Sequence, residues 1–396
     1  MEITILDLIN FKKLEGMKLI AGKNGLNRKV TDCGILDYEL DSVLKDKYSY
    51  NNFKEEQFVI TTFLYAKDDE HLIGEAVKYL ADKKVSCLAI KNIYKLPIHD
   101  YVLRYADSKD FPIFMMESHN LYFEKIIVDI NDCIKNNKNV EYGQKEIDSI
   151  LNKSLDNNSI KNYVHQLNPS LLSHYITIYF YFKEKMTFQK FDEFMSKYKN
   201  SKFFTPLVSM LRYRNGMIMI CSNEHIDKNE VDTRVEEIIN ALIEKKCNLY
   251  IGVSEIHHHL HEMKQSLNEC IYASMMNKEE KSLYISYKNI GSYKAIFPFA
   301  QNYEMQLFSN KILAPIQDFD AENKLNLTET LIHFIKCLGS ISELSKYLSL
   351  HENTIRNRME KISTITGLNF RNLEHYEQLS LAVKIYICNN LFDEFY

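Results

Sequence analysis

The chain has 396 residues, of which 45% are hydrophobic and 26% are charged, and its formal net charge is −4. This balance is typical of a folded protein of about two to four domains and excludes collagen-like and disordered chains. The 11 glycines and 6 prolines are few, which favours long helices over a turn-rich all-β fold. A slightly acidic net charge excludes a protein that coats nucleic acid through an overall basic surface, but it is compatible with a local basic patch.

No apolar stretch approaches the roughly 18 residues that a membrane span needs. The first residues, Met1–Thr4, contain no basic segment of the kind that opens a secretory signal. Eight cysteines are scattered singly, without the close pairs that hold zinc or an iron–sulfur cluster. We therefore expect a cytoplasmic protein with reduced cysteines, no metal or other cofactor, and no membrane partner.

Residues 1–122 alternate short runs rich in β-branched residues with helical patterns. The runs are Lys18–Ala21, Val30–Leu36, Phe58–Thr62, Cys87–Ile90 and Pro112–Met116. Apolar residues at helical intervals over 72–81 and 101–106 predict helices between the last three runs. This order predicts a mainly parallel α/β domain with right-handed crossovers.

Polar residues follow these predicted strands, at the edge where parallel sheets bind ligands. The candidates for contact with a small-molecule effector are Asp37, Thr61, Thr62, Lys91 and Glu117. Residues of these types more often cap turns or face solvent, so that alternative stays open.

Residues 123–166 predict a connecting helical segment. Apolar residues recur at helical intervals from Phe123 to Ile134 and from Ile147 to Leu155, and the polar run 136–139 interrupts the pattern. One face of this segment is expected either to meet a partner or to pack on its own domain.

Residues 167–295 predict a second αβ domain. The expected strands are Ser173–Phe182, Pro206–Tyr213, Gly216–Cys221 and Leu249–Val253, and the expected helices are Phe188–Tyr198, Val231–Glu244 and Leu260–Met276. Arg214-Asn215-Gly216 contains the Asn-Gly pair that is typical of a β-hairpin. The order β-α-β-β-α-β-α predicts a ferredoxin-like core.

The densest group of metal-competent side chains is His257, His258, His259 and His261. No cysteine or aspartate lies beside it, and it falls where a strand meets a helix. A solvated, histidine-rich turn is therefore favoured over a metal site.

Residues 296–396 have helical periodicity throughout, which predicts an all-α domain. Ser340 with Glu343 and Ser349 with Glu352 form two S-x-x-E capping boxes, each of which predicts a helix start. The first helix would span Ile341–Leu348, and the second would begin near Leu350 or His351. So tight a connection over 341–364 is typical of a helix-turn-helix.

The second of these helices is predicted to be amphipathic. Ile355, Met359 and Ile362 form an apolar stripe that should pack on Leu344 and Leu348. The opposite face offers amides, hydroxyls and cations over a segment, 344–371, with five basic and two acidic residues, a net charge of +3. Such groups read base edges and hold phosphates, whereas the alternative is an ordinary helical hairpin with a solvated face.

Each candidate for contact with DNA has an expected role. The candidates for base contacts are Asn353, Arg356 and Asn357, and those for phosphate contacts are Thr354, Arg358 and Lys361. Arg358 lies near the apolar edge and could instead be an internal ion-pair partner.

The segment His351–Ile362, followed by Thr366–Asn369, resembles the C-terminal helix-turn-helix of the PucR family of bacterial regulators. The family pattern is H-R-N-T-[LIV]-x-x-R-[LIM]-x-x-[IL], followed by T-G-x-[DN], and this chain departs from it by having Glu352 where arginine is usual. Segments of the first domain, Leu6–Leu8, Ala21–Val30, Val59–Thr62 and Leu88–Lys91, resemble the family's N-terminal sensory domain.

The middle domain resembles the degenerate GGDEF-like domain of such regulators. Its predicted hairpin, Arg212–Met217, lacks the acidic pair with which a diguanylate cyclase holds its metal ions, so cyclase activity is not expected. The resemblance implies a transcriptional regulator of purine or other nitrogen-source catabolism that responds to a small-molecule effector and is not an enzyme.

A single helix-turn-helix reads too few base pairs for specificity in a genome, so we expect a homodimer or a higher homo-oligomer on paired half-sites of a double-stranded DNA operator. Two alternatives are compatible with the same sequence. One is a nucleotide-binding or second-messenger enzyme built on the middle domain, and the other is a scaffold or ligand-binding protein.

Overall fold

The structure, a computed structural model, describes residues 3–10, 16–37, 53–117, 121–243, 248–280 and 282–395. The side chains of residues 136–139 and of Phe188 lie outside this description. The chain divides into two compact units. One comprises Met1–Ser149 with Met186–Ser201, and the other Ile150–Lys185 with Lys202–Tyr396.

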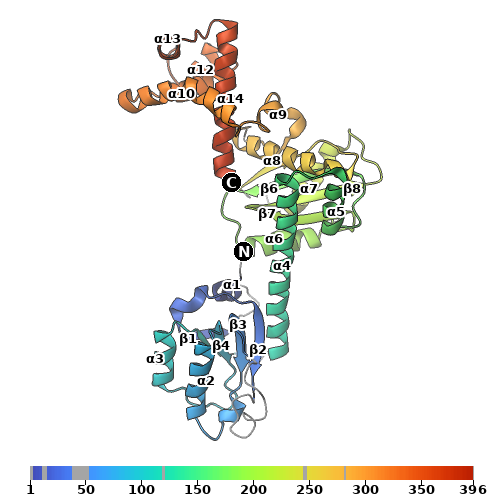
Figure 1. The fold of residues 1–396 in the computed structure, drawn as a ribbon, viewed down its shortest axis with the longest axis vertical. Coiled ribbons are helices and arrows are strands. Elements are labelled where there is room, and N and C mark those ends of the chain that lie inside the picture. Colours follow the sequence, from blue (N-terminus) through green and yellow to red (C-terminus); the bar gives the residue numbers. More distant parts are fainter. Residues whose placement is uncertain are drawn as a thin grey trace. The chain divides into compact units, whose positions relative to one another are not determined.

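The first unit contains a five-stranded sheet (Figure 1). Its strands are β1 (Met17–Ala21), β2 (Asp32–Leu36), β3 (Gln57–Thr61), β4 (Cys87–Ile90) and β5 (Ile113–Met116), in the order β1-β5-β4-β3-β2. β2 to β5 are parallel to one another, and β1 is antiparallel to β5. The predicted mainly parallel sheet is confirmed.

Within the described part of this domain, two helices connect the strands β3, β4 and β5, and three short elements accompany them. α2 (His71–Asp82) links β3 to β4, and α3 (Asp100–Ser108) links β4 to β5. The short elements are α1 (Ile5–Asn10), η2 (Lys23–Asn27) and η3 (Leu64–Ala66).

Both faces of this sheet are buried, which explains why its central strands are unbroken apolar runs. Phe58 and Ile60 of β3 belong to one apolar cluster, while Val59 points the other way into a second cluster with residues of α2 and α3. The first cluster also contains Ile126 and Ile130 of α4 (Phe123–Asn152). This part of the connecting helix therefore packs on its own domain, the second of the two alternatives that the sequence allows.

The polar run 136–139 does not end α4, which continues to Asn152. No glycine or proline lies in that run, so nothing there removes the helical hydrogen bonds. The break comes at 153–156, where Asp156 caps α5 (Asn157–Leu167) by accepting a hydrogen bond from the Ser159 amide.

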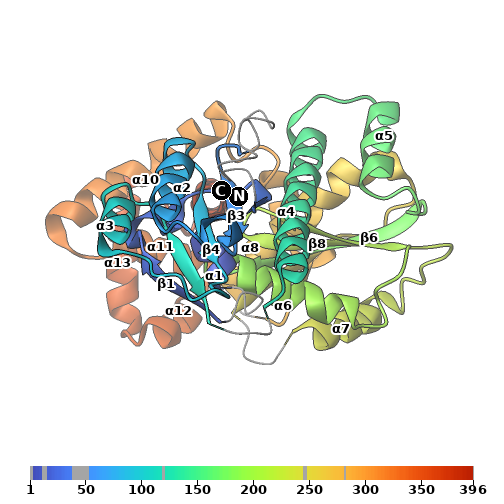
Figure 2. The same ribbon diagram turned by 90° about the horizontal axis from the view of Figure 1, so that it is seen from below.

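The second sheet has the predicted strands and one more. They are β6 (His174–Phe182), β7 (Val208–Tyr213), β8 (Gly216–Asn223), β9 (Leu249–Val253) and β10 (Ile285–Ser286), in the order β10-β9-β6-β8-β7. β6 runs beside β8 at the middle of the sheet (Figure 2), and among the strands that the structure describes only the β9–β10 pair is parallel. The helices of this stretch are α6 (Phe188–Lys199), α7 (Val231–Leu242) and α8 (Met263–Glu280).

A hairpin and a close helix–strand contact help to define this sheet. The predicted β7–β8 hairpin is confirmed, but its loop residues are Arg214 and Asn215, because Tyr213 already pairs with Gly216. Gly252 of β9 lies against α8, where a Cβ atom would come within 2.1 Å of the Cys270 carbonyl oxygen. Only glycine allows the helix to approach the strand so closely.

Beyond Ser286 the described chain is helical, as predicted. Its helices are α9 (Tyr293–Ile296), α10 (Tyr303–Asn323), α11 (Leu327–Lys336), α12 (Ile341–Leu348), α13 (Glu352–Thr366) and α14 (Leu373–Phe395), with short 3₁₀ turns η4 (Leu260–Glu262) and η5 (Tyr287–Asn289) before them. No helix in the described ranges is both long enough and apolar enough to cross a membrane.

The end of α14 is fastened to the second sheet. The Phe395 ring stacks on Tyr181 of β6 with 3.9 Å between centroids, and the Tyr181 hydroxyl donates to the Glu394 carbonyl at 3.2 Å. The Glu394 carboxylate also pairs with Lys278 of α8. α14 thus contacts the αβ region at one end and packs along α10 elsewhere.

Candidate nucleic-acid interface

α12 and α13 are joined by only three residues and pack through an apolar seam. Leu344 of α12 and Ile355, Met359 and Ile362 of α13 are completely buried. Leu348 is half-buried. The predicted apolar stripe is confirmed, and its burial fixes which face of α13 points outward.

The helix start at Ser340 is as predicted, because its hydroxyl oxygen accepts a hydrogen bond from the Glu343 amide at 3.2 Å. The second predicted capping box is wrong. Ser349 has φ 51°, in the left-handed region, and ends α12, whereas His351 caps α13 by accepting the Asn353 amide at Nδ1. The turn is so short that the residue after α12 must reverse the chain, which leaves its side chain unable to cap the next helix.

The exposed face of α13 carries the polar side chains that its periodicity predicts. The exposed candidates are Asn353, Thr354, Arg356, Asn357 and Lys361. They lie opposite the buried stripe, and their amide, hydroxyl and cationic groups are those that DNA-reading helices use. Their contact with DNA stays a prediction.

Arg356 is held by two neighbours on the same helix. Its guanidinium donates to the Glu352 carboxylate at 3.0 Å and to the Asn353 side-chain oxygen at 3.4 Å. Both charged partners are substantially exposed, so the pair contributes at most about 1 kcal/mol and opens readily. Glu352, which stands where the family pattern has arginine, therefore pairs with the guanidinium of Arg356, the main candidate for contact with guanine.

Arg358 faces inward. Its side chain is half-buried and donates to the Thr330 hydroxyl of α11 at 3.0 Å, and this fully buried hydroxyl in turn donates to the Asn326 carbonyl. The geometry matches the internal role left open above, with a hydroxyl in place of an acid. Sequence patterning does not single out Thr330, because one threonine on an apolar helix stripe forms no motif.

Lys361 and the end of α13 complete this surface. The Lys361 ammonium lies 4.8 Å from the centroid of the Phe319 ring of α10, a cation–π contact that leaves the charge exposed. Gly367, at φ 72°, ends the helix and donates its amide to the Ser363 carbonyl. Glu360 pairs with Arg371 at 3.1 Å.

The five effector candidates follow strands of the first sheet, but four of them make local contacts. The Thr61 and Thr62 hydroxyls accept the amides of Phe63 and Leu64. The Lys91 ammonium donates to the Leu121 carbonyl at 2.7 Å, and Glu117 pairs with Lys18 at 3.7 Å. Asp37 lies just before residues 38–52, which fall outside the described ranges. A shared effector contact stays a prediction.

The histidine cluster is the expected solvated turn at His258 and His259, which are exposed, but not at His257. His257 is only 5% exposed, because its backbone pairs with Tyr175 of β6. Its Nε2 lies 3.0 Å from the Glu269 carboxylate and its Nδ1 lies 3.5 Å from Glu262. Within the described residues no group of three or more His, Cys, Asp or Glu is arranged to hold a metal ion.

Glu262 lies at the rim of this cluster. Burial is the largest influence on its carboxyl group and would alone raise its pKa, but hydrogen bonds from the His258 and His259 amides and the nearby His257 and His259 rings together hold that pKa below its ordinary value.

Comparison with known proteins gives two matches to family models. Residues 7–134 match the purine catabolism regulatory protein-like family (PucR). Residues 327–385 match the PucR C-terminal helix-turn-helix domain, a range that covers α11, α12, α13 and half of α14.

Three relatives come from Bacillus subtilis (strain 168). The proline-responsive transcriptional activator PutR is 24% identical over 177 residues, which are 42% of this chain and 43% of that protein. The DNA-binding transcriptional activator AdeR is 25% identical over 107 residues, 27% of this chain and 25% of that protein. The purine catabolism regulatory protein is 30% identical over 118 residues, 30% of this chain and 21% of that protein.

The chain thus spans less than half the length of each of these relatives. A solved structure, the regulator of polyketide synthase expression from Bifidobacterium adolescentis, aligns with 62% of this chain and 97% of its own at 12% identity. Its TM-score of 0.31 is too low to establish a shared fold. The chain is therefore similar to the PucR family over its N-terminal region and to the PucR C-terminal helix-turn-helix domain over residues 327–385.

Proposed function

We propose that this chain is a bacterial transcriptional regulator that binds double-stranded DNA by placing α13 in the major groove. The observation that carries the proposal is the two-sided character of α13. One side is completely buried through Ile355, Met359 and Ile362, and the other presents exposed amides and cations. A helix fixed in this way presents a constant set of side chains to base edges.

We assign different tasks to the exposed side chains. Asn353, Arg356 and Asn357 contact base edges, because amides and guanidinium groups can make paired hydrogen bonds to purines. Thr354 and Lys361 hold phosphates. Arg358 positions α13 on α11 through Thr330 and does not contact DNA.

We infer that two copies act together in the cytoplasm, since one helix-turn-helix reads too few base pairs to select a site in a genome. In this view 1–122 is a sensor for a small-molecule effector, 123–166 is the connection, 167–295 is a GGDEF-like domain and 296–396 binds DNA. The names of the relatives, which refer to proline and to purine catabolism, support control of genes for the use of nitrogen compounds.

An enzymatic role for the middle domain has less support. The hairpin Arg212–Met217 has no carboxylate with which to bind a metal ion, and Arg212 is only 7% exposed. We therefore assign this domain a binding or structural role and not a cyclase reaction.

The decisive experiment is capture of fragmented genomic DNA by the purified full chain, followed by sequencing. We expect a small set of enriched fragments with a shared two-fold symmetric element, and retention that falls steeply as salt rises. The control is the doubly substituted Arg356→Ala, Asn357→Ala chain, which should lose the enrichment. Equal enrichment by both proteins, or none by either, would refute the proposal.

A further inference from the structure

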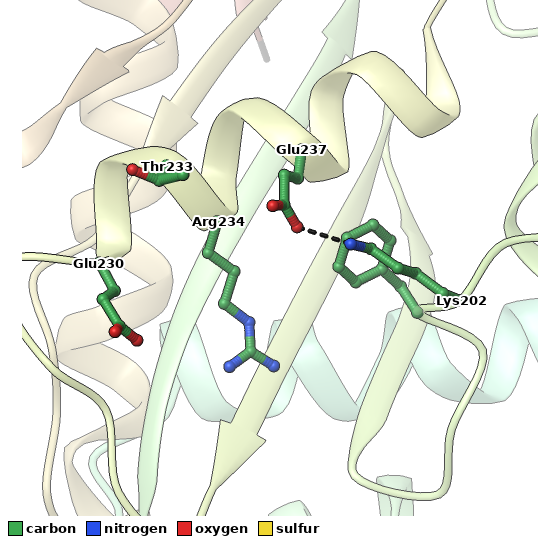
Figure 3. Close-up of a pocket in the computed structure, with 6 residues that line it drawn as sticks. Lys202, Glu230, Thr233, Arg234 and Glu237 are labelled. Atoms are coloured by element: carbon green, nitrogen blue, oxygen red, sulfur yellow. Dashed lines mark hydrogen bonds and ion pairs between the residues drawn. The ribbon is translucent and has the colours of Figure 1, made fainter.

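A groove beside α7 takes no part in the function proposed above (Figure 3). It has a volume of about 490 Å³, within the range of small-molecule sites, and lies between the helix and the segment before β7. Its lining residues are Lys202, Phe203, Glu230, Thr233, Arg234 and Glu237. A smaller recess of about 50 Å³ shares Glu230 and Arg234 with it.

Two charges in this groove lack a partner. Lys202 and Glu237 satisfy each other at 2.7 Å and are the pair joined in Figure 3. The guanidinium of Arg234 and the carboxylate of Glu230 extend into the same groove without an ion pair or side-chain hydrogen bond to any described residue. Arg234 is half-buried as a residue, and its guanidinium has no protein acceptor among the described residues, so it is available to a ligand.

The balance of charge restricts what can bind. A guanidinium fork matches a carboxylate through two parallel hydrogen bonds. However, Glu230, Glu237 and Asp227 all line the groove or its recess and would repel a ligand with several negative charges. A ligand that also carries a positive group would satisfy Glu230 and avoid this repulsion.

The shared recess supplies an apolar wall. Ile176, Cys221 and Val231 line it, and the first two are almost completely buried. Burial raises the pKa of the Cys221 thiol to about 12 despite the nearby Arg234, so the thiol stays neutral and suits an apolar group.

We propose that this groove binds a small α-amino acid. Its carboxylate lies on Arg234, its ammonium lies on Glu230, and its side chain points to the recess beside Ile176 and Cys221. The site does not depend on DNA binding, so the chain would hold a ligand in its middle αβ region whether or not α13 reads DNA.

The test is binding by the full chain, first by thermal shift with each standard α-amino acid at millimolar concentration and then by calorimetry. We expect at least one amino acid to raise the melting temperature and to bind with a micromolar to millimolar Kd. Arg234→Met and Glu230→Gln should each weaken binding by roughly tenfold or more. Glu236→Gln is the matched control, because it removes a carboxylate from the same helix outside the groove.

Three further comparisons sharpen this test. Propionate, which lacks the amine, and ethylamine, which lacks the carboxylate, should bind at least roughly tenfold more weakly than the amino acid. Arg234→Lys keeps the charge without the fork and should give intermediate affinity, which guards against misfolding of Arg234→Met. Binding of no amino acid, binding unchanged by both groove substitutions, or tighter binding of inorganic phosphate would each overturn the proposal.

Discussion

The guanidinium of Arg356 lies 3.0 Å from the carboxylate of Glu352, one turn earlier on α13. The same arginine is a candidate for reading a base edge, so this contact must open before Arg356 can bind DNA. Because the pair is exposed, opening costs little, about 1 kcal/mol or less. A charge in the protein thus competes with DNA for one side chain.

Replacement of Glu352 should strengthen DNA binding. Glu352→Gln frees Arg356 and should raise affinity by up to about fivefold, the equivalent of about 1 kcal/mol. Glu352→Arg adds a cation near the phosphates and should steepen the slope of log affinity against log salt by about 0.9. Electrophoretic mobility shift across a salt series measures both. Glu322→Gln on α10 is the control, and a gain of equal size there would contradict this account.

Substitution on the exposed face of α13 should separate DNA reading from folding. Asn357→Ala should reduce discrimination between operator and mismatched sites by about 1 to 3 kcal/mol while stability changes by less than about 0.5 kcal/mol. Ile355→Ala, on the buried face, should instead lose about 2 to 5 kcal/mol of stability. Competition binding measures the discrimination, and thermal unfolding measures the stability. If Asn357→Ala instead lost the stability and Ile355→Ala lost the discrimination, the proposed outward face of α13 would be wrong.

The two serines of the helix-turn-helix should respond differently to substitution. Ser340→Ala removes an N-cap and should lower the free energy of unfolding by about 1 kcal/mol, whereas Ser349→Ala should have almost no effect. Ser349→Gly should raise it by about 1 kcal/mol, because glycine adopts the left-handed conformation without steric cost. Urea unfolding tests this order. Equal losses from both alanine substitutions would restore Ser349 as a cap.

Arg358 and Thr330 should be coupled in stability. Arg358→Met, Thr330→Val and the double variant form a cycle, for which we expect a coupling energy of about 1 kcal/mol. Sequence preference for DNA should be unchanged in Arg358→Met. Arg358 holds a phosphate instead if the two substitutions are additive in stability and if Arg358→Met lowers both the affinity for DNA and the dependence of that affinity on salt.

The contribution of Glu262 to stability should depend on pH. Its pKa is lowered in the folded chain below the ordinary value of 4.5, so its stabilising effect is complete above that value and is lost as pH falls through the folded pKa. The melting temperature of the natural chain should exceed that of Glu262→Gln at neutral pH, and the difference should shrink below about pH 4.5. A constant difference down to pH 3 would contradict the shift.

The sequence predicts the secondary structure well where a side-chain period is coupled to burial. The strands around Val59 and Leu88 read as apolar runs because both faces of the sheet are covered. The stripe of Ile355, Met359 and Ile362 is correct for the same reason, since a helix has only one way to bury it. The polar run 136–139 interrupts the apolar period without ending the helix, because polar residues such as asparagine and lysine keep the backbone hydrogen bonds of a helix.

Features that depend on backbone dihedral angles or on distant partners are harder to predict. Ser349 and Glu352 have the residue types of a capping box, but residue type does not specify the left-handed φ that Ser349 adopts. The burial of His257 depends on pairing with Tyr175, a residue far away in sequence. The inward direction of Arg358 depends on Thr330 of another helix in the same way.

α14 has a mechanical consequence for the helical region. As a rod of 23 residues it is about 35 Å long, with Phe395 clamped on Tyr181 at one end and Leu373, just beyond α13, at the other. A tilt of only about 5° about the Phe395 end would move the Leu373 end by roughly 3 Å, about the length of a hydrogen bond. A small rearrangement of the Tyr181 and Phe395 rings would therefore displace the other end of α14, together with the helices packed on it, by several ångströms.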